Sequence, residues 1–149
     1  MLAKSTGVLE FTTGTYGQEI CVDSIIKGNE WIDENEACWI WRSYGMEVMD
    51  GQIVYRNVLN LMQDDGTYLV FLNSNQLNQY RTEKEFQTAS EYFGYLPIEG
   101  AKVQPIKENQ RNVLYKEWSE IPVFISSEKV AAAWNEIAEM LLNKFEPDA

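Results

Sequence analysis

Histidine is absent from this 149-residue sequence. Its absence excludes histidine-based catalytic triads, histidine general bases, and zinc or iron sites built on imidazole. A Gly-rich phosphate loop is missing as well. The remaining nucleophile pattern is Ser127 followed by Lys129, and helix capping explains that serine better. The sequence therefore predicts a protein that is not an enzyme and that needs no cofactor.

Cysteine is scarce, and the two that occur, Cys21 and Cys38, are far apart in the sequence. No Cys-x-x-Cys pair is present, which excludes a zinc knuckle and a thioredoxin-type redox site. Two scattered cysteines are more often free buried thiols than a disulfide. A disulfide would imply an oxidising compartment, so both states stay open at this point.

Basic residues are few: 12 Lys and Arg stand against 23 Asp and Glu, which gives a net charge of −11. Nucleic-acid backbones are bound through Lys and Arg, so we expect no direct nucleic-acid binding. Surplus carboxylates keep a domain soluble, which is the simpler explanation of the acidity. The alternative is a basic partner, such as a toxin or nuclease that is blocked by a mimic of its polyanionic substrate.

Long hydrophobic runs are also lacking, and no run approaches the length that spans a membrane, so we expect no transmembrane segment. No signal-like segment with a basic start and an apolar middle opens the chain. The protein is therefore expected to be cytosolic, or to have a targeting segment that this sequence does not contain. Its length and a hydrophobic content of 45% predict one folded domain, residues 1–149.

Alternating apolar and polar residues predict the first strands, at Gly7–Phe11, at Glu19–Lys27 and at residues 37–44. Gly28-Asn29 is a turn signal between the second and third of these strands. A four-residue loop from Gly28 to Trp31 would join the two strands as a hairpin.

The register of that hairpin decides how the two cysteines lie. Pairing Ile20 with Trp39 brings the apolar faces of the two strands together. The same register sets Cys21 opposite Cys38. We therefore expect their sulfur atoms to be neighbours, either bonded or free.

Turn signals divide the middle of the chain. Asp50-Gly51 predicts a hairpin between Met46–Met49 and Gln52–Leu61. Asp64-Asp65-Gly66 is a second turn, and it leads into Thr67–Asn73, the most apolar strand-forming run in the sequence. A continuous run of this kind is typical of a central strand that is buried on both faces.

Two helices are predicted in the second half of the chain. Residues Thr82 to Glu85 have the form of a capping box, so a short helix is expected near 82–93. Ser126 or Ser127 caps a second helix near 127–145 that should pack on the sheet. Its apolar stripe is expected to consist of Val130, Trp134, Ile137 and Leu141. Together these elements predict an α+β fold with a mainly antiparallel sheet or a small, partly closed β-barrel.

The middle of the chain, about residues 20–73, contains a strand that ends in a Lys27-Gly28 turn, a further strand, and then Gly66-Thr67-Tyr68-Leu69-Val70-Phe71-Leu72. This order resembles small OB-like β-barrel modules of secreted or lipid-anchored proteins of Gram-positive bacteria. Most such modules have no assigned activity, so no site residue is carried over, and the C-terminal helix is not part of their pattern. The resemblance implies an extracytoplasmic location, with the export signal outside this sequence. A cytoplasmic location is the alternative.

Two acidic turns are candidate sites, one with Asp33, Glu34 and Glu36 and the other with Asp64 and Asp65. A glycosidase needs two carboxyl groups about 5–10 Å apart across a cleft, but acids in turns are commonplace, and we favour ordinary solvated turns. Carboxylate oxygens also bind Ca²⁺, yet the first turn lacks the Asp-x-Asp-x-Asp-Gly spacing of a calcium loop. No metal site is therefore predicted.

Aromatic residues are abundant, with five Trp and eight Tyr. Such residues dominate binding hot spots and also serve as platforms for sugars. Alternation places Trp39 and Trp41 on one face of a strand, which we expect to face the core. Trp31, in an acidic loop, is the best candidate for an exposed contact, and Tyr44 is another.

The leading hypothesis is a non-enzymatic, β-rich module that binds a protein, peptide or glycan. Its candidate binding residues are Trp31, Asp33, Glu34, Glu36, Tyr44, Asp64 and Asp65. The alternative is a small acidic immunity or inhibitor protein that neutralises a basic toxin or nuclease. Acidic residues gathered on one face would favour the inhibitor, and dispersed ones the module. A carboxylate hydrolase, the third hypothesis, requires two acids that face each other in a pocket.

Overall fold

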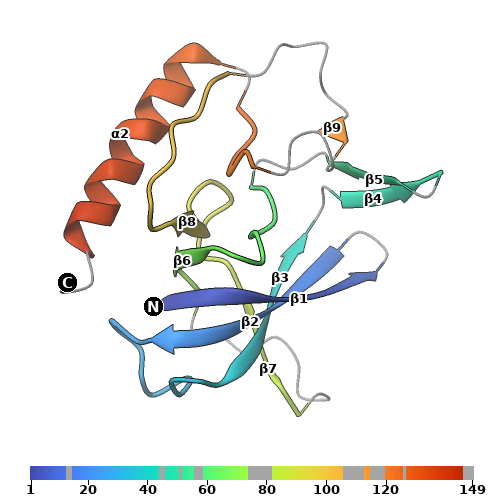
Figure 1. Cartoon of the computed structure of the whole chain (residues 1–149), viewed down its shortest axis with the longest axis vertical. Coiled ribbons are helices and arrows are strands. Elements are labelled where there is room, and N and C mark those ends of the chain that lie inside the picture. Colours follow the sequence, from blue (N-terminus) through green and yellow to red (C-terminus); the bar gives the residue numbers. More distant parts are fainter. Residues whose placement is uncertain are drawn as a thin grey trace.

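The computed structural model describes residues 1–12, 15–43, 46–50, 52–55, 59–73, 82–105, 113–114, 120–125 and 127–145. It has the α+β fold that the sequence predicts. A mixed sheet curls into a half-barrel, and one helix, α2 (Glu128–Lys144), lies beside it near the C-terminus. Figure 1 shows the half-barrel in the lower part of the molecule, with α2 at the upper left and a smaller sheet at the upper right.

The larger sheet has the strand order β7-β3-β2-β1-β6-β8, and its neighbours are antiparallel except β3 and β7, which run parallel. Beyond the ends of β6 and β7, Leu72 forms a bridge with Thr88, and the Asn73 N–H donates to the Gln87 carbonyl at 2.9 Å. This contact links the two sides of the half-barrel. The strands are β1 (Leu2–Thr12), β2 (Thr15–Ser24), β3 (Ala37–Ser43), β6 (Thr67–Val70), β7 (Lys84–Gln87) and β8 (Tyr95–Pro97).

The sequence predicts a buried central strand at Thr67–Asn73, and strand β6 confirms this for Thr67–Val70, where it ends three residues earlier than predicted. It pairs with β1 on one side and with β8 on the other. Tyr68, Leu69 and Val70 are all buried, although successive residues of a strand point to opposite faces. Tyr68 and Val70 join the interior of the half-barrel, and Leu69 pairs with Leu96 of β8. The run is therefore a central strand that is covered on both sides.

The smaller sheet has the order β4-β5-β9, with β4 at Met46–Met49, β5 at Gln52–Tyr55 and β9 at Val113–Leu114. Met49 pairs with Gln52, which confirms the hairpin predicted at Asp50-Gly51. Asp50 has a φ of 50°, the left-handed conformation that two-residue hairpin loops require.

The core has two parts. The interior of the half-barrel is filled mainly by residues of β1, β2, β3 and β6 and by Leu59 and Met62 from the segment that precedes β6. A buried amide secures that segment, because Gln18 donates to the Met62 carbonyl at 2.9 Å and accepts from the Met62 N–H at 3.1 Å. The second part lies under α2 and consists of Leu96, Val103, Val123, Ile125, Ala131, Trp134 and Ala138.

Helix α2 begins after Ser127, whose hydroxyl accepts a hydrogen bond from the Val130 N–H at 3.4 Å, so the predicted cap is confirmed. Trp134 anchors the helix: its ring stacks on Phe93 with the centroids 5.5 Å apart, and its indole N–H donates to the Tyr92 carbonyl at 2.9 Å.

The predicted apolar stripe of this helix is partly wrong. Val130 and Ile137 are 43% and 39% exposed, whereas Ala131 and Ala138 are buried on either side of Trp134. Small side chains next to the large indole allow the helix to approach the sheet closely. In the described part of the chain, no helix is long and apolar enough to cross a bilayer.

The short helix predicted near 82–93 is wrong, because Lys84–Gln87 forms strand β7. Phe86 of this strand lies beside Ile40 of β3 and is buried in the half-barrel. Pairing with an open sheet edge supplies hydrogen bonds and burial together, and this tertiary gain outweighs a local helix signal.

The predicted hairpin register between β2 and β3 is wrong by one residue, since Ile20 pairs with Cys38 and Cys21 with Ala37. The connecting loop is also longer than predicted and runs over residues 25–36. A long loop leaves the register to the packing of the strands. Cys38 therefore faces the core with Ile20, Cys21 projects from the other face, and both thiols are free.

Candidate binding groove

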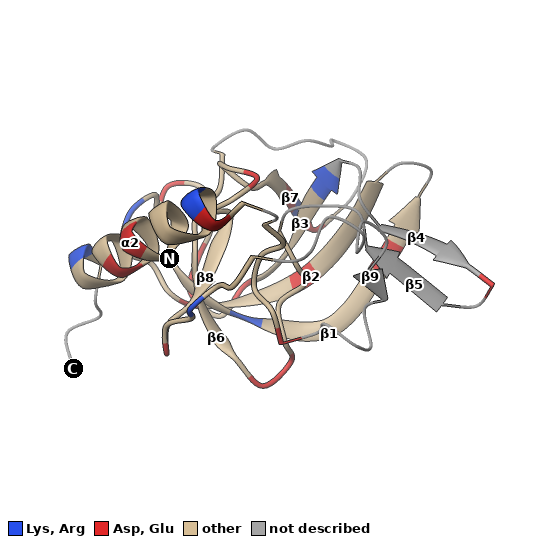
Figure 2. Cartoon of the chain, turned by 90° about the horizontal axis from the view of Figure 1, so that it is seen from above, with Lys and Arg blue, Asp and Glu red and all other residues tan. Residues whose placement is uncertain are grey.

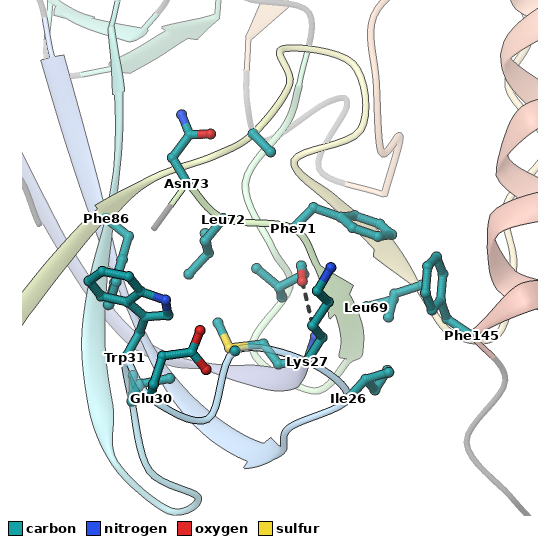
Figure 3. Close-up of a pocket in the computed structure, with 15 residues that line it drawn as sticks. Ile26, Lys27, Glu30, Trp31, Leu69, Phe71, Leu72, Asn73, Phe86 and Phe145 are labelled. Atoms are coloured by element: carbon teal, nitrogen blue, oxygen red, sulfur yellow. Dashed lines mark hydrogen bonds between the residues drawn. The ribbon is translucent and has the colours of Figure 1, made fainter. Parts of the chain in front are cut away.

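An open groove of about 590 Å³ lies where the β2–β3 loop passes the end of β6. Its walls come from parts of the chain that are distant in sequence: Met1, the loop at residues 26–28 and 30–32, the run at residues 69–73, Phe86 with Ala89, and Phe145 just after α2 (Figure 3). A mostly apolar cavity of a few hundred Å³ with few polar groups has the character of a ligand site.

Aromatic rings stand at both ends of this groove. Trp31 and Phe86 line one end, and Phe71 with Phe145 lines the other (Figure 3). Phe71 and Phe145 meet edge to face, with ring centroids 5.8 Å apart. Trp31 is 42% exposed, so its ring is open to a partner. The sequence prediction that Trp31 is exposed is therefore confirmed.

A turn at Gly28 positions the Trp31 ring. Gly28 has a φ of +95°, and its carbonyl accepts a hydrogen bond from the Trp31 N–H at 3.1 Å. Ile32, the next residue, is buried in the half-barrel core and holds this part of the loop in place. The loop thus presents its aromatic residue outward from a fixed base.

The acidic residues of the same loop stabilise the loop itself. The Glu34 carboxylate accepts the Ile25 N–H at 3.1 Å, and the Glu36 carboxylate accepts the Asp33 N–H at 3.0 Å. None of the predicted acidic binding residues, Asp33, Glu34 and Glu36, lines the groove.

Glu36 also forms an ion pair with Lys84 of β7, with 3.0 Å between Nζ and the carboxylate oxygen. Burial raises the pKa of Glu36. The hydrogen bonds from Asp33 and Lys84, together with the positive charge of Lys84, outweigh that effect, so the pKa of Glu36 lies below its usual value. This carboxylate therefore joins the loop to the edge of the sheet.

The second acidic turn lies outside the groove as well. Asp64 accepts a hydrogen bond from the Ser5 hydroxyl at 2.9 Å, which ties the turn to β1, and Asp65 is exposed. Among the described residues, no group of three or more His, Cys, Asp or Glu side chains is arranged to hold a metal ion.

Trp39 and Trp41 share one face of β3, as predicted, and their rings stack with the centroids 5.9 Å apart. The expectation that they face the core is only partly confirmed: Trp39 is buried, but Trp41 is half-buried, and Ile40 is the residue of this part of β3 that enters the half-barrel interior. Trp41 packs over Gly17, where an added Cβ would lie 2.9 Å from its ring. Tyr44, another predicted contact, lies outside the described residues.

The two cysteines do not contribute to the groove. Burial raises the pKa of the Cys38 thiol to about 12, and the negative charge of Glu36 adds to this effect. Cys38 is therefore an inert core residue.

Sequence reasoning missed most of the groove: Ile26, Lys27, Glu30, Phe71, Phe86 and Phe145 were not singled out for binding. The one local signal is Ile26, an apolar residue beside a charged one in a loop, and it is 43% exposed. The other residues come together only through the fold.

Comparison with known proteins finds no matching family model, and neither a curated protein nor a solved structure matches this chain. A function therefore has to be inferred from the chemistry of the groove.

Proposed function

We propose that this chain is a non-enzymatic binding module that takes a short peptide segment of a partner into the groove beside Trp31. The observation that carries the proposal is the groove itself, an open cavity of about 590 Å³ with an apolar floor and an exposed tryptophan at one end. A floor of this kind gains free energy by removing apolar ligand surface from water, at roughly 25 cal/mol per Å².

A peptide fits this groove better than a glycan. A sugar brings many hydroxyl groups that need hydrogen-bond partners, and unsatisfied ones oppose binding. The side chains of the groove that can donate or accept strongly are few, namely Lys27, Glu30 and Asn73 beside the Trp31 indole. Apolar side chains of a peptide need no hydrogen-bond partners in the groove.

The residues that line the groove argue against a hydrolase. Glu30 is the one carboxylate among the described residues of the groove, whereas glycoside hydrolysis generally needs a pair of carboxyl groups facing each other across the cleft. With no histidine in the chain to act as a base, binding is the simpler role.

The distribution of charge favours a binding module over an acidic inhibitor. In Figure 2 the Asp and Glu residues of the described chain are spread over α2, the strands and several turns. A mimic of a nucleic acid needs its carboxylates gathered on one face to repeat the spacing of phosphates. Dispersed acids are expected for solubility.

The order of pairing supports an OB-like barrel. Strands β1, β2 and β3 follow one another, β7 returns parallel to β3, and β6 closes onto β1, an arrangement compatible with a partly open Greek-key barrel. Helix α2 and strand β8 would be additions to it. An extracytoplasmic location remains part of the proposal because it follows from this resemblance. It is tested by locating the native protein in cell fractions.

Selection of peptides displayed on phage tests the function. We expect the selected peptides to share apolar or aromatic residues, and their affinity to fall at least tenfold in Trp31→Ala. The matched control is Ile98→Ala, which removes an exposed apolar side chain outside the groove and should leave binding unchanged. A selection that yields no binders, or binders that ignore Trp31→Ala, contradicts the proposal.

A further inference from the structure

Two side chains of opposite charge enter the groove from the same loop. Figure 3 shows the Glu30 carboxylate directed into the cavity beside Trp31, while the Lys27 amine points toward Phe71 on the other side. Apolar residues line the groove along its length, among them Leu72 beside Trp31 and Leu69 beside Phe145 (Figure 3). The groove therefore has a negative side chain toward the Trp31 end, a positive side chain toward the Phe71 end, and apolar residues along its walls. The Met1 amine also lines it, and it donates to the Val70 carbonyl at 3.2 Å.

Neither charge is neutralised by another residue of the described part of the chain. Lys27 and Glu30 form no ion pair with any other residue that the structure describes, in contrast to Lys84, which is paired with Glu36. Both side chains are exposed, so each remains available to a ligand. Because the two charges lie toward different ends of the groove, a ligand with one charge at each end would bind in one direction only.

We propose that the groove selects a segment with charges of opposite sign on either side of an apolar centre. The basic group lies beside Glu30 and Trp31, and the acidic group lies beside Lys27. This inference rests on the proposed function and adds the chemistry of the ligand to it.

Two features favour the basic group at the Trp31 end. A Lys or Arg that reaches Glu30 lies next to an indole ring, and a cation over such a ring gains further attraction. Glu30 is also the one carboxylate among the described residues that line the groove, so a basic group finds its partner at this end. At the other end Lys27 is the one Lys or Arg among the described residues that line the groove, and the Met1 amine already donates to the Val70 carbonyl, so an acidic group meets Lys27 there.

Four tetrapeptides with blocked termini test this inference. Their common centre is Leu-Phe, and their outer residues are Lys and Glu, two Lys, two Glu, or two Gln. Binding is followed by ¹⁵N NMR of the whole chain, with the Trp31 indole N–H as reporter. The mixed Lys/Glu peptide should bind about fivefold more tightly than each of the others, as expected for one or two partly exposed ion pairs.

Charge reversal should then switch the preference. Glu30→Lys should bind the two-Glu peptide best, and Lys27→Glu the two-Lys peptide best. The matched control is Lys102→Glu, which changes the same charge outside the groove and should keep the preference for the mixed peptide.

The two proposals fail in different ways. If all four peptides shift the Trp31 signal with equal affinity, or if reversal leaves the order unchanged, the charge selectivity is wrong and the binding groove stands. If none of the peptides shifts that signal, both the selectivity and the proposed function are contradicted.

Discussion

Trp31 contacts Gly28 through both its backbone and its indole ring. The Trp31 N–H donates to the Gly28 carbonyl at 3.1 Å, and the indole Cδ1 is 3.7 Å from the position that a Cβ on Gly28 would occupy. The turn needs a φ of +95° at this glycine, a conformation that other residues adopt only with strain. The exposed ring of the groove thus depends on a glycine three positions earlier.

Replacing that glycine should affect both stability and binding. We expect Gly28→Ala to lower the free energy of unfolding by about 1 kcal/mol through backbone strain, and to weaken peptide binding by displacing Trp31. Gly100→Ala is the matched control, because Gly100 also has a positive φ, of +77°, but lies outside the groove. Urea denaturation and peptide titration of both variants separate the two effects. Equal binding by the two variants would show that the turn does not position the ring.

Substitutions on the exposed side of helix α2 should affect stability far less than substitutions on its buried side. Truncation of Trp134 to Ala removes a buried, stacked indole and should cost about 3–5 kcal/mol, whereas Ile137→Ser changes an exposed residue and should cost no more than about 0.5 kcal/mol. Thermal unfolding of the two variants measures the difference. A large loss in Ile137→Ser would mean that this side of the helix is covered by another part of the protein.

The elements that the sequence predicts well are those defined by local signals. Asp50-Gly51 marks its hairpin through turn chemistry, and Ser127 marks the start of α2 through its cap. Strand β7 could not be predicted in this way, because its pairing with β3 comes from residues more than forty positions earlier. The same applies to Gln18, a polar residue of β2 whose buried amide binds the backbone of Met62.

The two thiols should differ in reactivity. Because burial raises the pKa of Cys38 to about 12, this thiol should not react with an aromatic disulfide reagent at about pH 8 in the native protein. Cys21 is only partly buried and should react first. We therefore expect one thiol to be titrated in the native state and two in denaturant, with the native signal lost in Cys21→Ser. Reaction of Cys38 in the folded protein would argue against its place in the core.

Acid should weaken the tie between the β2–β3 loop and the sheet. The pKa of Glu36 is lower in the folded protein than its ordinary value of 4.5, so its ionised form stabilises the fold. This contribution is complete above about pH 4.5 and is lost as the pH falls through the lowered folded pKa.

The urea midpoint of Glu36→Gln should therefore fall less steeply than that of the unaltered protein between about pH 5 and pH 3. Asp23→Asn breaks the more exposed Lys4–Asp23 pair and serves as the control for losing an ion pair, with an expected cost of no more than about 1 kcal/mol at neutral pH. If the urea midpoint of Glu36→Gln fell with pH as steeply as that of the unaltered protein, Glu36 would not contribute to the acid sensitivity of the fold.

The binding groove shows why a site of this kind is hard to predict from sequence. The aromatic excess and the exposure of Trp31 are visible in the sequence, but its neighbours Phe71, Phe86 and Phe145 join it only when the half-barrel closes and α2 docks. The acidic turns are predicted as binding sites because of their charge, yet the Glu34 and Glu36 carboxylates accept hydrogen bonds from backbone N–H groups of their own loop. A sequence shows that a carboxylate is present, but it does not show whether that carboxylate is already hydrogen-bonded within the folded protein.

Peptide binding beside Trp31 can be observed by ¹⁹F NMR of the protein labelled with 5-fluorotryptophan, with the resonances assigned by Trp→Phe replacement. On titration with the mixed-charge peptide, the Trp31 resonance should move, while those of Trp39, Trp41 and Trp134, which lie outside the groove, should stay in place. A shift of the other tryptophans without Trp31, or no shift at any concentration that the peptide allows, would contradict binding in this groove.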